Sequence, residues 1–87
     1  MQIRNWFYRY KLQRSAIRAA ELAFQADHLH TPILWAHIQV EEMAHFVVRI
    51  GYDLTRPPRL AFYSVSKVTN IAWYIIDDIA YRPSVWR

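Results

Sequence analysis

Three side chains that can bind a metal ion recur at intervals of four residues in the middle of the chain. His37, Glu41 and His45 would lie along one edge of a helix, because residues four apart share a helix face. Imidazole nitrogens and a carboxylate oxygen that project in one direction can ligate a transition metal. The alternative is structural, with His37 and Glu41 flanking an apolar stripe and hydrogen-bonded to each other or to water. We favour the structural interpretation and keep a metal-binding helical protein as the third functional hypothesis.

The sequence offers no other catalytic constellation. The chain has no cysteine, which excludes disulfides, thiolate metal sites and cysteine nucleophiles. Its single glycine leaves no phosphate-binding loop, and its serines lie in no nucleophile elbow. Asp77 and Asp78 form no carboxylate dyad, because adjacent helical residues point about 100° apart. We therefore predict a protein that is not an enzyme and that carries no cofactor.

Positive charge is concentrated in the first quarter of the chain. The whole chain has a formal charge of +4, and its first 20 residues contain basic side chains and no acidic one. These basic residues are Arg4, Arg9, Lys11, Arg14 and Arg18. Because aromatic residues alternate with them, the segment suits phosphate groups, an anionic membrane surface or an acidic protein groove. The plainer alternative is a solvated helix face whose aromatic side joins the core.

Proline and glycine divide the chain into three long segments. Thr31 and Pro32 have the pattern of a helix start, and Gly51 that of a left-handed helix end. Pro57 and Pro58 form a stiff connector. Apolar residues at steps of three and four predict helices over residues 12–29, 32–50 and 59–81. Residues 1–11 are either an arm or a helix extension, and residues 82–87 are a tail.

The third segment requires a choice between helix and strand. It is rich in valine, isoleucine, tyrosine and threonine, which favour strands. Its apolar residues nevertheless form one stripe at helical spacing, with Lys67 and Asp77 on the other side, so we interpret it as a helix. The sequence therefore predicts an all-α single domain over residues 1–87. We expect a small three-helix fold of antiparallel helices with N- and C-terminal arms, completed by oligomerisation.

Aromatic residues are more numerous than three short helices can bury. The chain contains four Trp, six Tyr and four Phe. Exposed aromatic patches rimmed by charge usually mark binding surfaces, and Trp, Tyr and Arg anchor interfaces. The alternative is that these rings cover the core of a monomer. We expect five of them to contact a partner, namely Trp35, Phe46, Tyr63, Tyr74 and Trp86.

These features predict a non-catalytic interaction or structural protein. It would be a homo-oligomer, such as a homodimer, or a small subunit of a larger complex. The second hypothesis is a nucleic-acid-binding accessory protein that contacts phosphate through the basic N-terminal segment. No run of 18 apolar residues exists, so we expect no membrane span. The sequence has no visible signal peptide and no cysteine, which favours an intracellular location.

Overall fold

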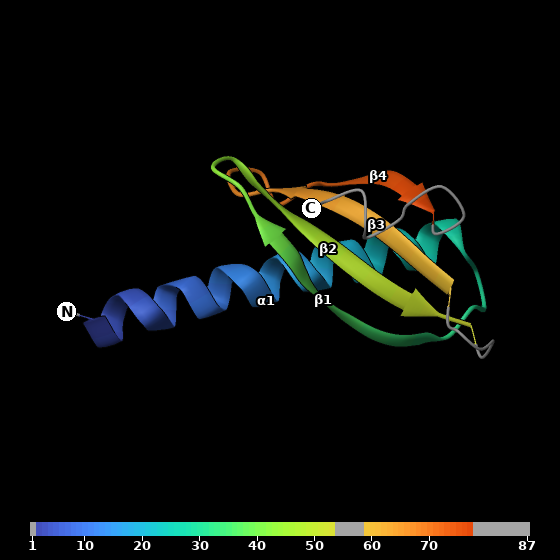
Figure 1. The fold of residues 1–87 in the computed structure, drawn as a ribbon, viewed down its shortest axis with the longest axis horizontal. Coiled ribbons are helices and arrows are strands. Elements are labelled where there is room, and N and C mark those ends of the chain that lie inside the picture. The colour runs from blue at the N-terminus through green and yellow to red at the C-terminus, as the bar shows by residue number, and fades with distance from the viewer. Residues whose placement is uncertain (1, 54–58, 78–87) are drawn as a thin grey trace.

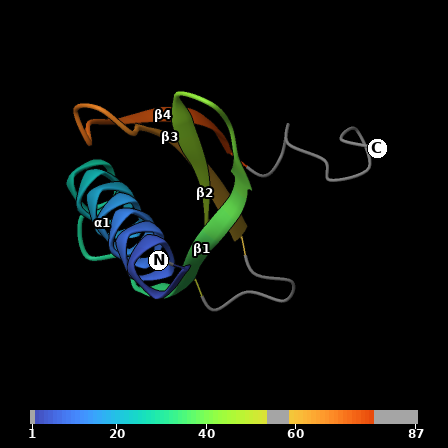
Figure 2. The ribbon, with the colours of Figure 1, turned by 90° about the vertical axis from the view of Figure 1, so that its left-hand side faces the viewer.

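One helix and a four-stranded sheet make up the fold. The computed structural model describes residues 2–53 and 59–77, with side chains described for residues 8–53 and 59–75. The elements in chain order are α1 (Gln2–Asp27), β1 (Ile33–Glu41), β2 (His45–Tyr52), β3 (Arg59–Ser66) and β4 (Ala72–Asp77). All neighbouring strands are antiparallel, in the order β1-β2-β3-β4. The helix lies across one face of this sheet (Figure 1). Figure 2 looks along α1 from its N-terminal end and shows the sheet curving around one side of the helix.

The expectation of an all-α, three-helix domain is wrong. Segment 32–50 contains β1 and most of β2, and segment 59–81 contains β3 and β4. The central strands β2 and β3 are buried along most of their length, so their apolar residues show no two-residue alternation. Register shifts interrupt the pairing of β1 with β2 and of β3 with β4, and they displace the pattern by one residue. Within residues 59–81, the content of β-branched and aromatic residues indicated strands correctly, whereas the spacing of apolar residues did not.

The helix is longer than the sheet that it covers. Residues 2–27 are continuously helical, so residues 2–11 extend the helix and do not form a separate arm. A helix of 26 residues is about 39 Å long, whereas a strand of eight residues spans about 27 Å. The N-terminal end of α1 therefore projects past the hairpin ends of the sheet, as Figure 1 shows.

The main core lies between α1 and the sheet. Ala16, Ala20 and Phe24 are spaced one turn apart along α1, and all three are buried. The small alanines let the helix backbone approach the sheet, and Phe24 fills the space near the end of the helix. The sheet contributes alternate residues of its central strands, namely Phe46, Val48, Ile50, Tyr52, Ala61, Tyr63 and Val65.

Turns are marked by residues other than glycine. His30, Asp53 and Asn70 have φ values of 67°, 67° and 60°, which asparagine and aspartate tolerate better than most residues. Gly51 has no positive φ and lies inside β2, so it does not end a helix as expected. In the β3–β4 turn, the hydroxyl of Ser66 accepts hydrogen bonds from two backbone N–H groups at 3.1 and 3.2 Å.

Replacing Phe24 tests the contact that holds the helix on the sheet. Phe24 is fully buried, and its ring centroid lies 4.8 Å from that of Tyr52. Phe24→Ala should therefore lower the free energy of unfolding by about 3–5 kcal/mol. Leu22 lies on the same helix but is 51% exposed, so Leu22→Ala should cost less than about 1 kcal/mol. Urea denaturation followed by circular dichroism measures both, and equal losses would contradict the packing of α1.

Candidate interaction site

The expected metal ligands do not converge. His37 lies on the sheet face turned away from α1, which we call the outer face, whereas Glu41 bonds to two cations. The Nε2 atom of His45 lies 2.7 Å from Oε1 of Glu42, its neighbour in the β1–β2 turn. Spacing of four places ligands together on a helix, but here β1 ends and the chain turns before His45. Within residues 2–53 and 59–77, no group of three or more ligating side chains could hold a metal ion.

The five expected partner contacts are divided between the core and the surface. Phe46 and Tyr63 are only 3% and 1% exposed, because alternate residues of central strands face α1. Both side chains therefore belong to the core between α1 and the sheet. Trp35 is partly buried on the outer face, and Tyr74 is 51% exposed on β4. Trp86 lies outside the described residues.

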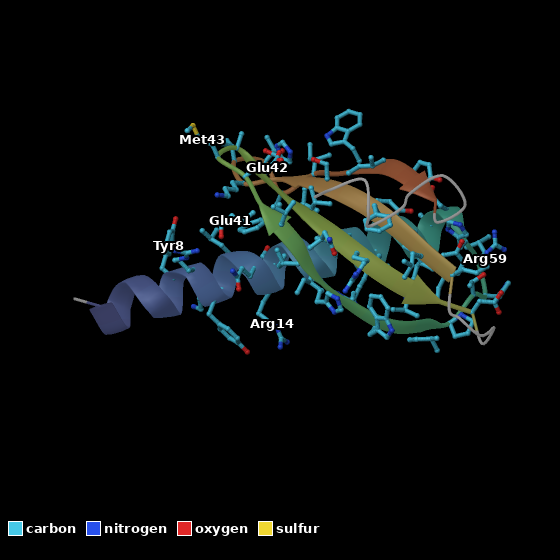
Figure 3. All side chains as sticks on the ribbon, in the orientation of Figure 1. Tyr8, Arg14, Glu41, Glu42, Met43 and Arg59 are labelled. Atoms are coloured by element: carbon cyan, nitrogen blue, oxygen red, sulfur yellow. The ribbon has the colours of Figure 1, made fainter. Side chains whose placement is uncertain are left out.

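The basic residues of the first quarter have different surroundings. Arg4 precedes the residues whose side chains the structure describes, and Arg9 bonds to Glu41. Three others remain exposed on α1, namely Lys11, Arg14 and Arg18. At about 100° per residue, these three lie within an arc of about 60°, so α1 carries a short positive stripe. Figure 3 shows Arg14 extending from α1 on the side opposite Glu41.

Glu41 links the helix to the hairpin end of the sheet, where Figure 3 shows it close to the β1–β2 turn. Its Oε1 accepts a hydrogen bond from Arg9 Nη2 at 2.9 Å, and its Oε2 accepts one from Lys67 Nζ at 2.8 Å. The backbone N–H of Lys67 donates to the carbonyl of Ala44 at 2.9 Å, which joins the two hairpin turns. The hydrogen bond from Lys67, together with the charges of Lys67 and Arg9, lowers the pKa of Glu41 against an opposing effect of desolvation.

A compact group of three side chains lies on the outer face. Trp35 and His37 are two residues apart on β1, and Arg49 on β2 is the cross-strand partner of His37. The Trp35 and His37 rings stack with centroids 4.7 Å apart and planes within 6°. The Cζ atom of Arg49 lies 5.3 Å from the Trp35 ring centroid, and its Nη2 lies 2.7 Å from Nε2 of His37. We call Trp35, His37 and Arg49 the outer-face cluster.

Gly51 makes room for the outer-face cluster. It is the cross-strand partner of Trp35, whose indole covers it. A Cβ atom at this position would overlap the indole ring. The only glycine of the chain is therefore needed for a close approach within the sheet and not for a turn.

Strand β4 forms an apolar edge of the sheet. The strand order gives it β3 as its neighbour on one side and places it at the boundary. Ile71, Trp73, Tyr74 and Ile75 are 52%, 66%, 51% and 45% exposed. Edge strands usually carry charged residues or proline, which prevent pairing with other chains. Residues 71–76 contain neither, and the one charged residue of β4 is Asp77 at its end. The opposite edge, β1, contains His37 and ends at Glu41, and its pairing with β2 has two register irregularities.

The sequence analysis predicted neither the outer-face cluster nor the apolar edge at β4. Trp73, Ile75 and Arg49 were not among the expected contacts. The strand-like composition of residues 71–76 was a signal for the edge. No comparable signal marked the outer-face cluster, since its members come together only through the register of β1 with β2.

Comparison with known proteins identifies no family, because no family model, curated protein or solved structure matches the chain. Among the residues that the structure describes, no helix combines the length and the apolar character needed to cross a membrane. To that extent, the expectation that no helix spans a membrane is confirmed.

Gly51→Ala tests the close packing of Trp35. The added methyl group must displace the indole, so the free energy of unfolding should fall by about 1–3 kcal/mol. In a Trp35→Ala background the same methyl group has space, and Gly51→Ala should then cost less than about 0.5 kcal/mol. Urea denaturation of both single variants and the double variant completes the cycle. Additive losses would show that Trp35 does not cover Gly51.

Glu41→Gln tests the link between helix and hairpin end through its pH dependence. A carboxyl group whose folded pKa is lowered stabilises the fold above its ordinary pKa of 4.5, and this stabilisation disappears as the pH falls through the folded pKa. The wild-type chain should therefore melt at a higher temperature than Glu41→Gln at neutral pH, and the difference should shrink below pH 4.5. Glu42→Gln, at the next residue along the chain, is the matched control. A difference independent of pH would contradict the assignment.

Proposed function

We propose that the chain is a non-catalytic interaction protein that associates with a second copy of itself through the edge of β4. The observation that supports this proposal is the uncharged sequence of residues 71–76 at the boundary of the sheet, in which Ile71, Trp73, Tyr74 and Ile75 are exposed. A strand edge presents backbone N–H and C=O groups in the order that another strand requires, so an apolar edge favours the addition of a strand.

Two copies of β4 can pair about a two-fold axis. With the axis perpendicular to the sheet, the two strands run antiparallel and each four-stranded sheet continues into the other. Both copies of α1 then lie on the same side of the joined sheet. The side chains of Trp73, Tyr74 and Ile75 would contact those of the second copy, as aromatic and β-branched residues do between antiparallel strands.

Charge favours this edge over the other surfaces for self-association. Each copy carries a formal charge of +4, so two copies repel each other wherever their basic groups approach. Residues 71–76 contain no charged side chain, the one charge of β4 is the acidic Asp77, and basic groups farther away are screened beyond about 8 Å at physiological salt. A six-residue edge is a small interface, and small interfaces form weak complexes, so we expect an association that reverses on dilution.

Trp73→Lys tests the proposal directly. Trp73 is 66% exposed, so the substitution adds a charge to the edge without removing a buried side chain. Light scattering and sedimentation at increasing concentration should show the wild-type chain passing from monomer to dimer. Trp73→Lys should weaken the dimer at least about tenfold, which is about 1.4 kcal/mol.

Leu34→Lys is the matched control, because Leu34 is 39% exposed on the opposite edge strand β1. It should dimerise like the wild-type chain. A wild-type chain that remains monomeric at every concentration would overturn the proposal, as would equal effects of the two lysine variants. Growth beyond the dimer would also overturn it, because it would show open-ended aggregation and not a closed two-fold pair.

A further inference from the structure

We propose that the outer-face cluster is a carboxylate-binding site, in which the guanidinium of Arg49 binds the anion beside the indole of Trp35. The site lies on β1 and β2, so it neither requires nor explains the association through β4. No catalytic step is involved, and the ligand class follows from the charge and the hydrogen-bonding capacity of the cluster.

Arg49 is a partly buried cation in apolar surroundings. Its cross-strand partner on β3 is Phe62, which is fully buried, and Val47, two residues before it on β2, is 4% exposed. The Trp35 ring covers its guanidinium from β1. Moving a charge out of water is costly unless it is paired with an opposite charge or fully hydrogen-bonded. The position of Arg49 therefore favours a negatively charged neighbour.

Among the described residues, Arg49 has no negatively charged neighbour to pair with. No carboxylate within residues 8–53 and 59–75 forms an ion pair with Arg49. Its Nη2 is bonded to the imidazole of His37, and its Nε is buried without a hydrogen-bond partner. A guanidinium has five N–H groups and no acceptor. The Arg49 guanidinium therefore has one neutral acceptor, the His37 imidazole. A guanidinium is able to bind a carboxylate with two parallel hydrogen bonds.

His37 keeps the cluster at a single positive charge. Burial lowers the pKa of His37, and the adjacent charge of Arg49 lowers it further. The imidazole is therefore neutral at pH 7, with Nε2 accepting the hydrogen bond from Arg49 and the proton on Nδ1. One positive charge matches one carboxylate, whereas a phosphate group carries up to two negative charges and normally requires more cations.

The Trp35 ring gives the site its orientation. The indole beneath the guanidinium and the hydrogen bond to His37 limit the movement of the Arg49 side chain, so less freedom is lost when it binds a planar anion. Because Trp35 is only partly buried, an apolar group next to the carboxylate can contact the ring. A carboxylate attached to an aromatic group should therefore bind more tightly than acetate.

Nuclear magnetic resonance of the labelled full-length chain tests the site. Sodium benzoate, sodium acetate and sodium phosphate are each titrated at constant ionic strength, with sodium chloride as the balancing salt. Benzoate should cause saturable shifts in the side-chain signals of Arg49, His37 and Trp35. Acetate should shift the same signals with weaker affinity, and phosphate should bind no more tightly than acetate.

Variants of Arg49 separate the site from general charge effects. Arg49→Lys keeps the charge but loses the planar fork, so it should weaken benzoate binding at least about tenfold. Arg59→Gln is the matched control, because Arg59 is an exposed arginine on β3 that also lies over an aromatic ring. It should bind benzoate like the wild-type chain.

His37→Gln retains a hydrogen-bond acceptor for Arg49 and should keep at least part of the affinity. Circular dichroism confirms that each variant is folded before titration. Shifts that rise linearly without saturation would overturn the proposal, as would tighter binding of phosphate or an equal loss of affinity in Arg59→Gln.

Discussion

A single helix covers one face of a four-stranded sheet, and the rest of the molecule depends on this asymmetry. On the covered face, Ala16, Ala20 and Phe24 complete a continuous core with alternate residues of β2 and β3. On the outer face, the described residues form a smaller buried apolar cluster around Val47 and Phe62. Because no second helix among the described residues shields that face, an arginine and an indole can lie there side by side, next to residues that are fully buried.

The helix is held to the sheet at both ends of their contact. At the hairpin end, Glu41 connects Arg9 of α1 with Lys67 of the β3–β4 turn. At the other end, the hydroxyl of Tyr63 donates a hydrogen bond of 2.8 Å to Asp27. Apolar burial is not directional and would by itself let α1 rotate or slide along its alanine face. The polar contacts at the two ends fix the position of α1 on the sheet, because hydrogen bonds require a defined geometry. The fixed helix is what separates a covered face from an outer face.

The sequence predicted the helix better than the sheet, for physical reasons. Alanines at helical spacing over residues 16–26 favour a helix in any context, and residues 12–27 are helical. The strands were missed because β2 is buried on both faces, and the register shifts remove the alternation that identifies a strand. Gly51 was misread because a glycine that accommodates a ring looks the same in sequence as one that ends a helix. The outer-face cluster depends on pairing between strands, which the sequence alone did not reveal.

The distribution of charge favours one mode of association over others. A net charge of +4 opposes random contact between copies, and the exposed cations of α1 extend that repulsion along the helix. The β1 edge adds irregular pairing and polar residues, which make it a poor template for another strand. Residues 71–76 contain no charged side chain, so the repulsion between basic groups is weakest along this edge. The proposed two-fold pair would use this edge and would leave neither copy with an exposed β4.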